Sequence, residues 1–134
     1  MTRQGDLSHY NSCNVLSLHA LLGAYSGEGA QWLDELRPVL ADNIRYACDF
    51  IAAHFPGVQV MQPQGTYMLF LDCAAWLQEH HMTLRELEER GARAGVIWQD
   101  GAAFAWPDSI RMNLALPHSR LVEAMERLRV HAFC

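Results

Sequence analysis

"DSIRMNLALP" (residues 108–117) places an arginine inside a segment that otherwise has the pattern of a half-buried β-strand. Apolar side chains occupy every second position, as expected of a sheet with one buried and one open face. These apolar residues are Ile110, Met112, Leu114 and Leu116. Arg111 and Asn113 share the opposite face, and Pro117 ends the segment. The pattern therefore predicts a strand that presents a guanidinium and an amide on its open face.

The composition is that of a folded domain with an acidic balance. The chain has 134 residues, of which 51% are hydrophobic and 19% charged, and its formal net charge is −5. This length suffices for a hydrophobic core. We expect no nucleic-acid partner, because the net charge opposes one and the sequence has no basic cluster. We also expect no membrane partner and a cytoplasmic location, since there is no long apolar run and no signal-peptide pattern.

Two features of the residue content bear on chemistry. The four cysteines, at positions 13, 48, 73 and 134, share no metal-binding spacing, and we expect them to be reduced. All 10 basic residues are arginine, so the chain contains no lysine.

The periodicity along the chain predicts an α+β fold. Helical spacing covers residues 11–25, 30–54 and 83–93, and a final amphipathic helix begins near Leu121. Strands are predicted at 58–61, 66–73, 96–98 and 110–116, with a loop or helical turn around 74–81. The order is α-α-β-β-α-β-β-α. We expect a small mixed or antiparallel sheet of about four strands, with the helices packed on one face.

Local signals add detail to this outline. Thr83 and Glu86 have the spacing of a capping box at a helix start, and Gly95 is placed to end that helix. Pro38 predicts either a kink or a new helix start within 30–54. The strand at 66–73 is apolar on both faces in its middle, which predicts a central position in the sheet.

Three segments in register resemble a known family. They are "PQGTYMLFLDC" (63–73), "GVIWQDGAAF" (95–104) and "IRMNLALP" (110–117). Together they resemble the C-terminal small domain of fold-type-I pyridoxal-phosphate (PLP) enzymes, in the class I/II aminotransferase branch that includes cystathionine beta-lyase-like carbon–sulfur lyases. "WLDEL" (32–36) resembles the long helix that leaves the large domain of these enzymes. The resemblance implies that residues 1–30 end the large domain and that residues 31–134 form the small domain.

The resemblance also implies a role for the strand arginine. In the family, the arginine of an R-x-N motif binds the α-carboxylate of the amino-acid substrate, which makes Arg111 the substrate clamp and Asn113 a supporting residue. A guanidinium suits this task because its rigid fork of donors matches a carboxylate bidentately. The alternative is a solvated or ion-paired surface arginine, the usual fate of a charged residue on a half-exposed strand.

The missing lysine limits what this chain does unaided. The family's chemistry needs a lysine that forms a Schiff base with PLP. Arginine does not replace it, because the guanidinium stays protonated. We therefore expect a C-terminal fragment of an aminotransferase or carbon–sulfur β-lyase that is inactive alone. PLP belongs to the intact enzyme and is not expected to be bound covalently here. No catalytic residue is assigned in this chain, and transamination and β-elimination both remain open.

The chain departs from the family pattern near the expected pocket. Gln99-Asp100-Gly101 replaces the usual Asn-Pro-Gly turn, and the following loop, "AWPDS" (105–109), is short. Trp98 and Trp106 are candidates for lining the pocket mouth, with sheet packing the favoured interpretation for Trp98. "EHH" (79–81) lacks a third ligand at suitable spacing and favours a polar surface over a metal site.

Two further functions remain open. One is a non-catalytic α+β module that binds a small carboxylate. The other is assembly, with the apolar helices at 11–25 and 30–54 as an oligomer interface. In either case we expect the apolar faces of residues 1–30 to be covered, by a homo-oligomer or by rearrangement onto the small domain, because a large bare apolar surface is unfavourable.

Overall fold

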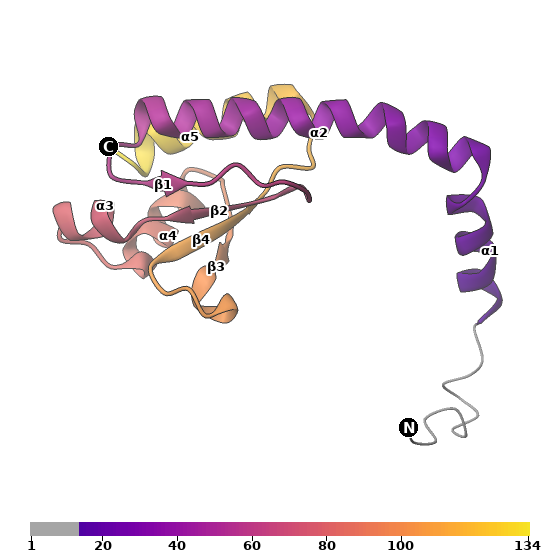
Figure 1. Cartoon of the computed structure of the whole chain (residues 1–134). Helices are drawn as coiled ribbons and strands as arrows, with labels where there is room; N and C mark the ends of the chain where they lie inside the picture. Colours follow the sequence, from indigo (N-terminus) through magenta and orange to yellow (C-terminus); the bar gives the residue numbers. More distant parts are fainter. Residues whose placement is uncertain (1–13) are drawn as a thin grey trace, which may run out of the picture. The chain divides into compact units, whose positions relative to one another are not determined.

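Four short strands form one antiparallel sheet, as the alternation predicts. In the computed structural model, which describes residues 14–134, the strands are β1 (Gln59–Val60), β2 (Met68–Asp72), β3 (Gln99–Asp100) and β4 (Ser109–Asn113). Their order is β1-β2-β4-β3, and each neighbouring pair is antiparallel (Figure 1). β2 lies inside the sheet, which confirms its predicted central position.

The helices are α1 (Val15–Ala24), α2 (Gly27–His54), α3 (Ala74–Glu79), α4 (Leu84–Arg93) and α5 (His118–His131), with a 3-10 helix, η2 (Gly101–Phe104), before β4. Both the element order and the α+β class agree with the prediction. No helix within residues 14–134 is long and apolar enough to cross a membrane.

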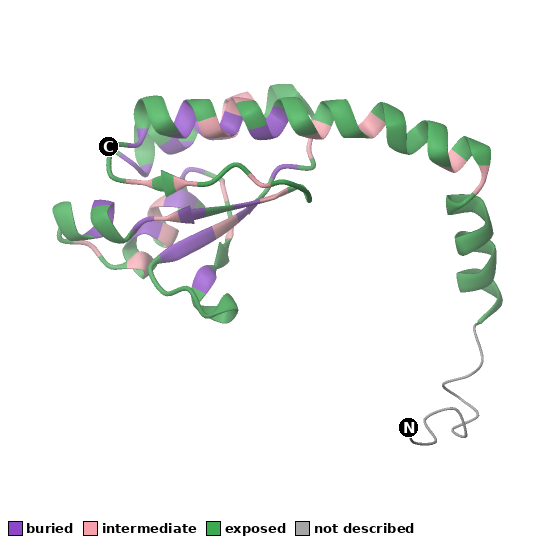
Figure 2. Cartoon of the chain, viewed as in Figure 1, coloured by how far each residue is buried: buried purple, intermediate pink, exposed green. Residues whose placement is uncertain are grey.

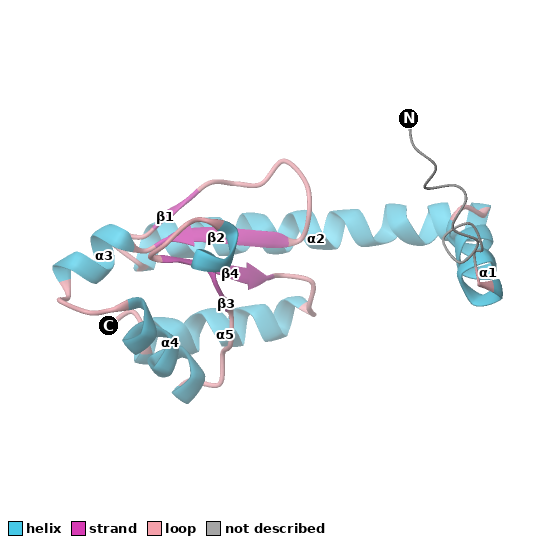
Figure 3. Ribbon diagram, turned by 90° about the horizontal axis from the view of Figure 1, so that it is seen from below, coloured by secondary structure: helices cyan, strands magenta, loops and turns pink. Residues whose placement is uncertain are grey.

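The core lies between one sheet face and the helices of residues 39–134. Leu69 and Leu71 of β2 and Ile110 and Met112 of β4 are buried on this face. They join buried side chains of the second half of α2 and of α3, α4 and α5 in one cluster. Figure 2 colours the buried residues purple, and Figure 3 shows the helices and the sheet from below. The α-helices of this unit therefore cover a single face of the sheet, as predicted.

The chain divides into two compact units, residues 1–38 and residues 39–134. Within the described part of the first unit, α1 has no buried residue. The predicted boundary lies earlier, between residues 30 and 31. The assignment of residues 1–30 to a large domain stays a prediction, and residues 1–13 of that segment, with Cys13, lie outside the described residues.

The second helix is longer than predicted. It starts at Gly27 because the Ser26 hydroxyl accepts the Gly29 N–H at 3.1 Å and caps the first turn. It then continues through Pro38 to His54, so the alternative of a new helix start at Pro38 is wrong. Pro38 forgoes one backbone hydrogen bond, and burial of Ile44, Ala47 and Ile51 stabilises the turns that follow.

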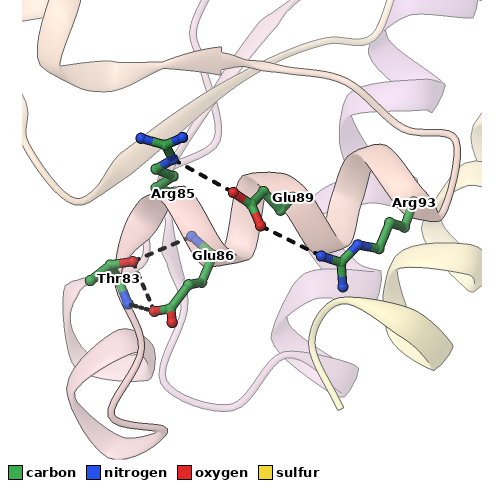
Figure 4. Close-up of polar contacts among 5 residues, drawn as sticks. All are labelled: Thr83, Arg85, Glu86, Glu89 and Arg93. Carbon is green, nitrogen blue, oxygen red and sulfur yellow. Dashed lines mark hydrogen bonds and ion pairs between the residues drawn. The ribbon is translucent and has the colours of Figure 1, made fainter.

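α4 begins and ends as predicted, and Figure 4 shows the polar contacts at its start and along it. The Thr83 hydroxyl accepts the Glu86 N–H at 3.3 Å, and the Glu86 carboxylate accepts the Thr83 N–H at 2.8 Å. These two hydrogen bonds form the capping box. The Thr83 N–H and the Thr83 hydroxyl, which also donates to the Glu86 carboxylate at 2.8 Å, lower the pKa of Glu86. Glu89 lies between Arg85 and Arg93, 3.5 Å from each guanidinium.

The strand predicted at 96–98 is wrong, and β3 begins at Gln99. Gly95 has a positive φ of 79°. Its N–H donates to the Ala92 carbonyl, and the Val96 N–H donates to the Gly91 carbonyl. This Schellman arrangement engages residues 95 and 96 in ending α4. Trp98 then packs on Gly91, where an added Cβ would contact its indole ring. The sheet pairing therefore starts at Gln99, directly after Trp98.

The strand predicted at 110–116 ends early, at Asn113. The Asn113 Oδ1 accepts the Ala115 N–H at 2.8 Å, which turns the chain. The carbonyls of Leu114 and Leu116 both accept from the buried Asn43 side chain, at 2.9 Å each. These two hydrogen bonds tie the segment after β4 to α2.

Candidate functional site

The sheet face opposite the helices carries the strand arginine. We call it the open face. It consists of Met68, Phe70 and Asp72 of β2 with Ser109, Arg111 and Asn113 of β4. Arg111 lies between Phe70 on one neighbouring strand and Gln99 on the other. The two-residue period of strands places it there, since its neighbours Ile110 and Met112 are buried in the core.

The Arg111 guanidinium is held on two sides. Its Nη1 donates to the Gln99 Oε1 at 3.1 Å. Its Cζ lies 4.5 Å from the centre of the Phe104 ring, a cation–π contact. Phe104 in turn meets Phe70 edge-on, with ring centres 5.5 Å apart. Among residues 14–134, no carboxylate forms an ion pair with Arg111, unlike the ion pairs formed by most other arginines of that range.

Arg111 lines a cavity of about 780 Å³ over the open face. The β1–β2 connection, residues 61–66, forms one side of it, and Phe104 and Trp106 contribute another. Asp72 and Ser109 also line it. A cavity of this size falls in the range of small-molecule sites, on the order of 300–1,000 Å³. The arrangement can therefore hold an anionic small molecule against the guanidinium.

The structure does not bring Asn113 into this cavity. Asn113 lies on the open face but is not among the residues that line the cavity, and its Oδ1 binds the Ala115 N–H. Its supporting role for Arg111 stays a prediction. The contact that it does make ends the strand.

The two candidate tryptophans have different positions. Trp106 is 49% exposed and lines the cavity. Trp98 packs on Gly91 of α4 and does not line it, which confirms the packing interpretation. The Trp98 Nε1 is buried with no hydrogen-bond partner within residues 14–134.

The other polar candidates serve local structure. Cys73 is fully buried, and burial together with Asp72 and Asp108 raises the pKa of its thiol to about 12, so it is a poor nucleophile. The His80 Nδ1 contacts the Trp76 carbonyl at 2.9 Å, and its ring stacks on the Trp76 indole. Cys48 and Cys134 are free thiols, as is Cys73.

Sequence reasoning missed the two residues that hold the guanidinium. Gln99 was not predicted because the third strand was placed at 96–98, and a strand with those bounds does not include Gln99. Phe104 was not predicted because a 3-10 helix, which the sequence did not indicate, places its ring over the sheet. The only available signal was the two-residue alternation of β4, which identifies the open face but not what covers it.

No family model matches the chain. Protein MalY of Escherichia coli is 33% identical to it over 122 residues, which are 88% of this chain and 30% of MalY. A cystathionine beta-lyase of Corynebacterium glutamicum is 35% identical over 118 residues, which are 86% of this chain and 30% of that protein. The chain thus spans about 30% of the length of these curated relatives.

Solved structures show the same relationship. A PLP-bound C–S lyase from Staphylococcus hominis superposes with a TM-score of 0.77 and 26% identity, over 87% of this chain and 31% of the lyase. Cystalysin from Treponema denticola, a PLP-containing protein, superposes with a TM-score of 0.75 and 28% identity, over 87% of this chain and 29% of cystalysin.

Proposed function

Because this chain is homologous to the C-terminal domain of fold-type-I PLP enzymes related to cystathionine beta-lyases, we propose that its Arg111 binds the α-carboxylate of an amino-acid substrate. One observation carries the proposal. A guanidinium without an acidic partner among the described residues is held in a small-molecule cavity by Gln99 and Phe104.

The geometry suits recognition of a carboxylate. The guanidinium has five N–H donors in a planar fork, and Gln99 engages one of its nitrogens. A carboxylate accepts two parallel hydrogen bonds from such a fork. Phe104 covers the plane of the guanidinium and limits its rotation, which lowers the entropy lost on binding. Arg111 therefore positions the substrate and performs no proton transfer.

The side chains of this chain do not fit covalent binding of PLP. The related enzymes are PLP-bound, and this cofactor needs a lysine amine for its Schiff base, whereas the chain contains no lysine. We infer that additional protein supplies the cofactor-binding half of the site and that this chain alone has no turnover. The part played by Arg111 is the same for an aminotransferase and for a carbon–sulfur lyase.

A titration followed by NMR tests the carboxylate site. We expect L-alanine to bind the wild-type chain with a Kd on the order of 1–10 mM. In Arg111→Gln we expect no saturable binding, because the charge and the fork are both lost. In Arg111→Lys we expect weaker binding, because the charge remains without the fork.

Arg45→Gln is a matched control. Arg45 is exposed and pairs with Asp42 on α2, so its loss leaves the cavity intact. Equal affinity in the wild-type chain and Arg111→Gln would overturn the proposal.

A second candidate function, self-association, rests on the first unit. The apolar residues of α1 are exposed, with Leu16 at 81%, as is Tyr25 after its end at 86%. We propose that a homo-oligomer covers this surface, since water disfavours an apolar face of this kind. Sedimentation of the wild-type chain and of Leu16→Glu tests it. A monomer in both samples would refute it.

A further inference from the structure

Three aromatic side chains gather where the Arg111 guanidinium faces the cavity. They are Phe70 of β2, Phe104 of η2 and Trp106 of the loop after η2, and all line the cavity. Each is a large apolar residue with considerable exposure, at 38%, 45% and 49% respectively. Aromatic groups this exposed beside a charged anchor are well suited to contact a bound ligand.

We propose that this aromatic wall selects substrate amino acids that have an aromatic or large apolar side chain. The inference rests on the proposed function of Arg111, because the guanidinium sets where the carboxylate lies. The side chain of an amino acid starts one carbon from its carboxylate. It therefore lies beside Phe104, the ring that covers the guanidinium.

Hydrogen bonds and one left-handed residue fix the backbone of the loop that carries Trp106. The Ser109 hydroxyl donates to the Trp106 carbonyl at 2.6 Å, and the Trp106 N–H donates to the Gly101 carbonyl at 3.1 Å. Between them, Ala105 adopts a left-handed φ of 60°. A non-glycine residue holds this conformation when its surroundings impose it. The backbone of Trp106 is thus fixed before a ligand arrives.

Gly101 makes this loop possible. A Cβ at that position would lie 2.8 Å from the backbone oxygens of both Ser109 and Trp106. Only glycine lets η2 pack this closely against β4. The tight loop brings Trp106 to the same cavity as Arg111.

Two methionines and an aspartate among the other lining residues, which also include polar side chains, suit the same ligand class. Met61 and Met68 add flexible apolar surface, which adapts to the shape of a large side chain. Asp72 lines the cavity from β2, two positions from Phe70. A second carboxylate on the substrate would meet this acidic side chain, so dicarboxylic amino acids are disfavoured.

A ligand series on the full chain tests the inference, with L-phenylalanine, L-alanine and L-aspartate compared by NMR titration. We expect phenylalanine to bind at least about tenfold more tightly than alanine, a difference of about 1.4 kcal/mol. Aspartate should bind no more tightly than alanine. The indole N–H resonance of Trp106 should shift with phenylalanine and remain unchanged with alanine.

Variants separate this inference from the proposed function. In Trp106→Ala we expect the ratio of phenylalanine affinity to alanine affinity to fall below about threefold. Trp32→Ala, an exposed residue of the first unit, is the matched control and should keep the full preference.

Each negative result has its own meaning. Equal affinity for phenylalanine and alanine in the wild-type chain would overturn the aromatic selection alone, even if Trp106→Ala did not fold. Absence of Arg111-dependent binding for every acid would instead overturn the proposed function.

Discussion

Replacing Asn43 with alanine tests how the segment that follows the arginine strand is held. The Asn43 side chain is fully buried. Its Nδ2 donates to the carbonyls of Leu114 and Leu116 at 2.9 Å each, and its Oδ1 lies 3.0 Å from the His118 Nδ1. These partners are more than 70 positions away in the chain, so the Asn43 side chain joins α2 to the end of β4 and the start of α5.

The magnitude follows from the hydrogen bonds that the substitution removes. Each neutral hydrogen bond contributes about 1 kcal/mol net, and a buried group left unpaired costs about 1–3 kcal/mol. Water can reach the exposed His118, whereas the Leu114 carbonyl stays in the core. We therefore expect Asn43→Ala to lower the free energy of unfolding by about 3 kcal/mol. With a urea m-value of about 1–1.5 kcal/mol/M, the midpoint should fall by about 2–3 M.

Urea unfolding followed by circular dichroism and by tryptophan fluorescence measures this change. Asp42→Ala is the control on the adjacent position, since its exposed ion pair with Arg45 should contribute less than about 0.5 kcal/mol. A loss below about 1 kcal/mol in Asn43→Ala would refute the reasoning. It would mean that the two carbonyls find other partners at little cost.

Three further predictions concern the loop, a helix cap and a thiol. Gly101→Ala should destabilise the chain by about 1–3 kcal/mol in urea unfolding, because the added Cβ would crowd backbone oxygens at 2.8 Å. Gly65→Ala, with no atom within 4 Å, should change little. Thr83→Ala should remove about 1 kcal/mol at neutral pH. The Thr83 hydroxyl also donates to the Glu86 carboxylate and helps to lower its pKa, so this part of the loss should shrink as the pH falls through that lowered value. Cys73, whose thiol has a pKa of about 12, should remain unmodified by iodoacetamide at a pH of about 8 in peptide mass analysis.

A result opposite to any of these expectations would contradict the structural reason given for it. Equal stability of the Gly101 and Gly65 variants would mean that η2 moves freely away from β4. A stability loss in Thr83→Ala that does not change in acid would mean that the Thr83 hydroxyl does not stabilise the ionised Glu86 carboxylate. Rapid alkylation of Cys73 in the folded chain would show that the strand end opens readily.

Short-range patterns predicted much of the fold. The alternation around Arg111 sufficed for β4 because period two separates the core face from the open face whatever the neighbours are. The capping box of Thr83 and Glu86 was readable because both partners lie within one helical turn. The glycine stop at Gly95 has the same local origin.

Features that depend on residues far apart in the sequence could not be predicted from it. β3 starts at Gln99 because its pairing partner is Arg111, twelve positions later, and because α4 engages residues 95 and 96. Nothing near Asn43 in the sequence marks the two carbonyls that it binds. In the site, the place of Arg111 on the open face was predicted from its own strand and its role from the family resemblance, whereas Gln99 and Phe104 depend on how β3 and η2 return to the sheet.

The most direct test of the central claim compares two ligands that differ only in the carboxylate, L-alanine and L-alaninamide, on the same wild-type chain. The observable is the side-chain Nε–H resonance of Arg111. We predict that alanine shifts this resonance in a saturable way and that alaninamide leaves it in place. Equal shifts with both ligands, or no shift with either, would contradict the assignment of Arg111 as a carboxylate site.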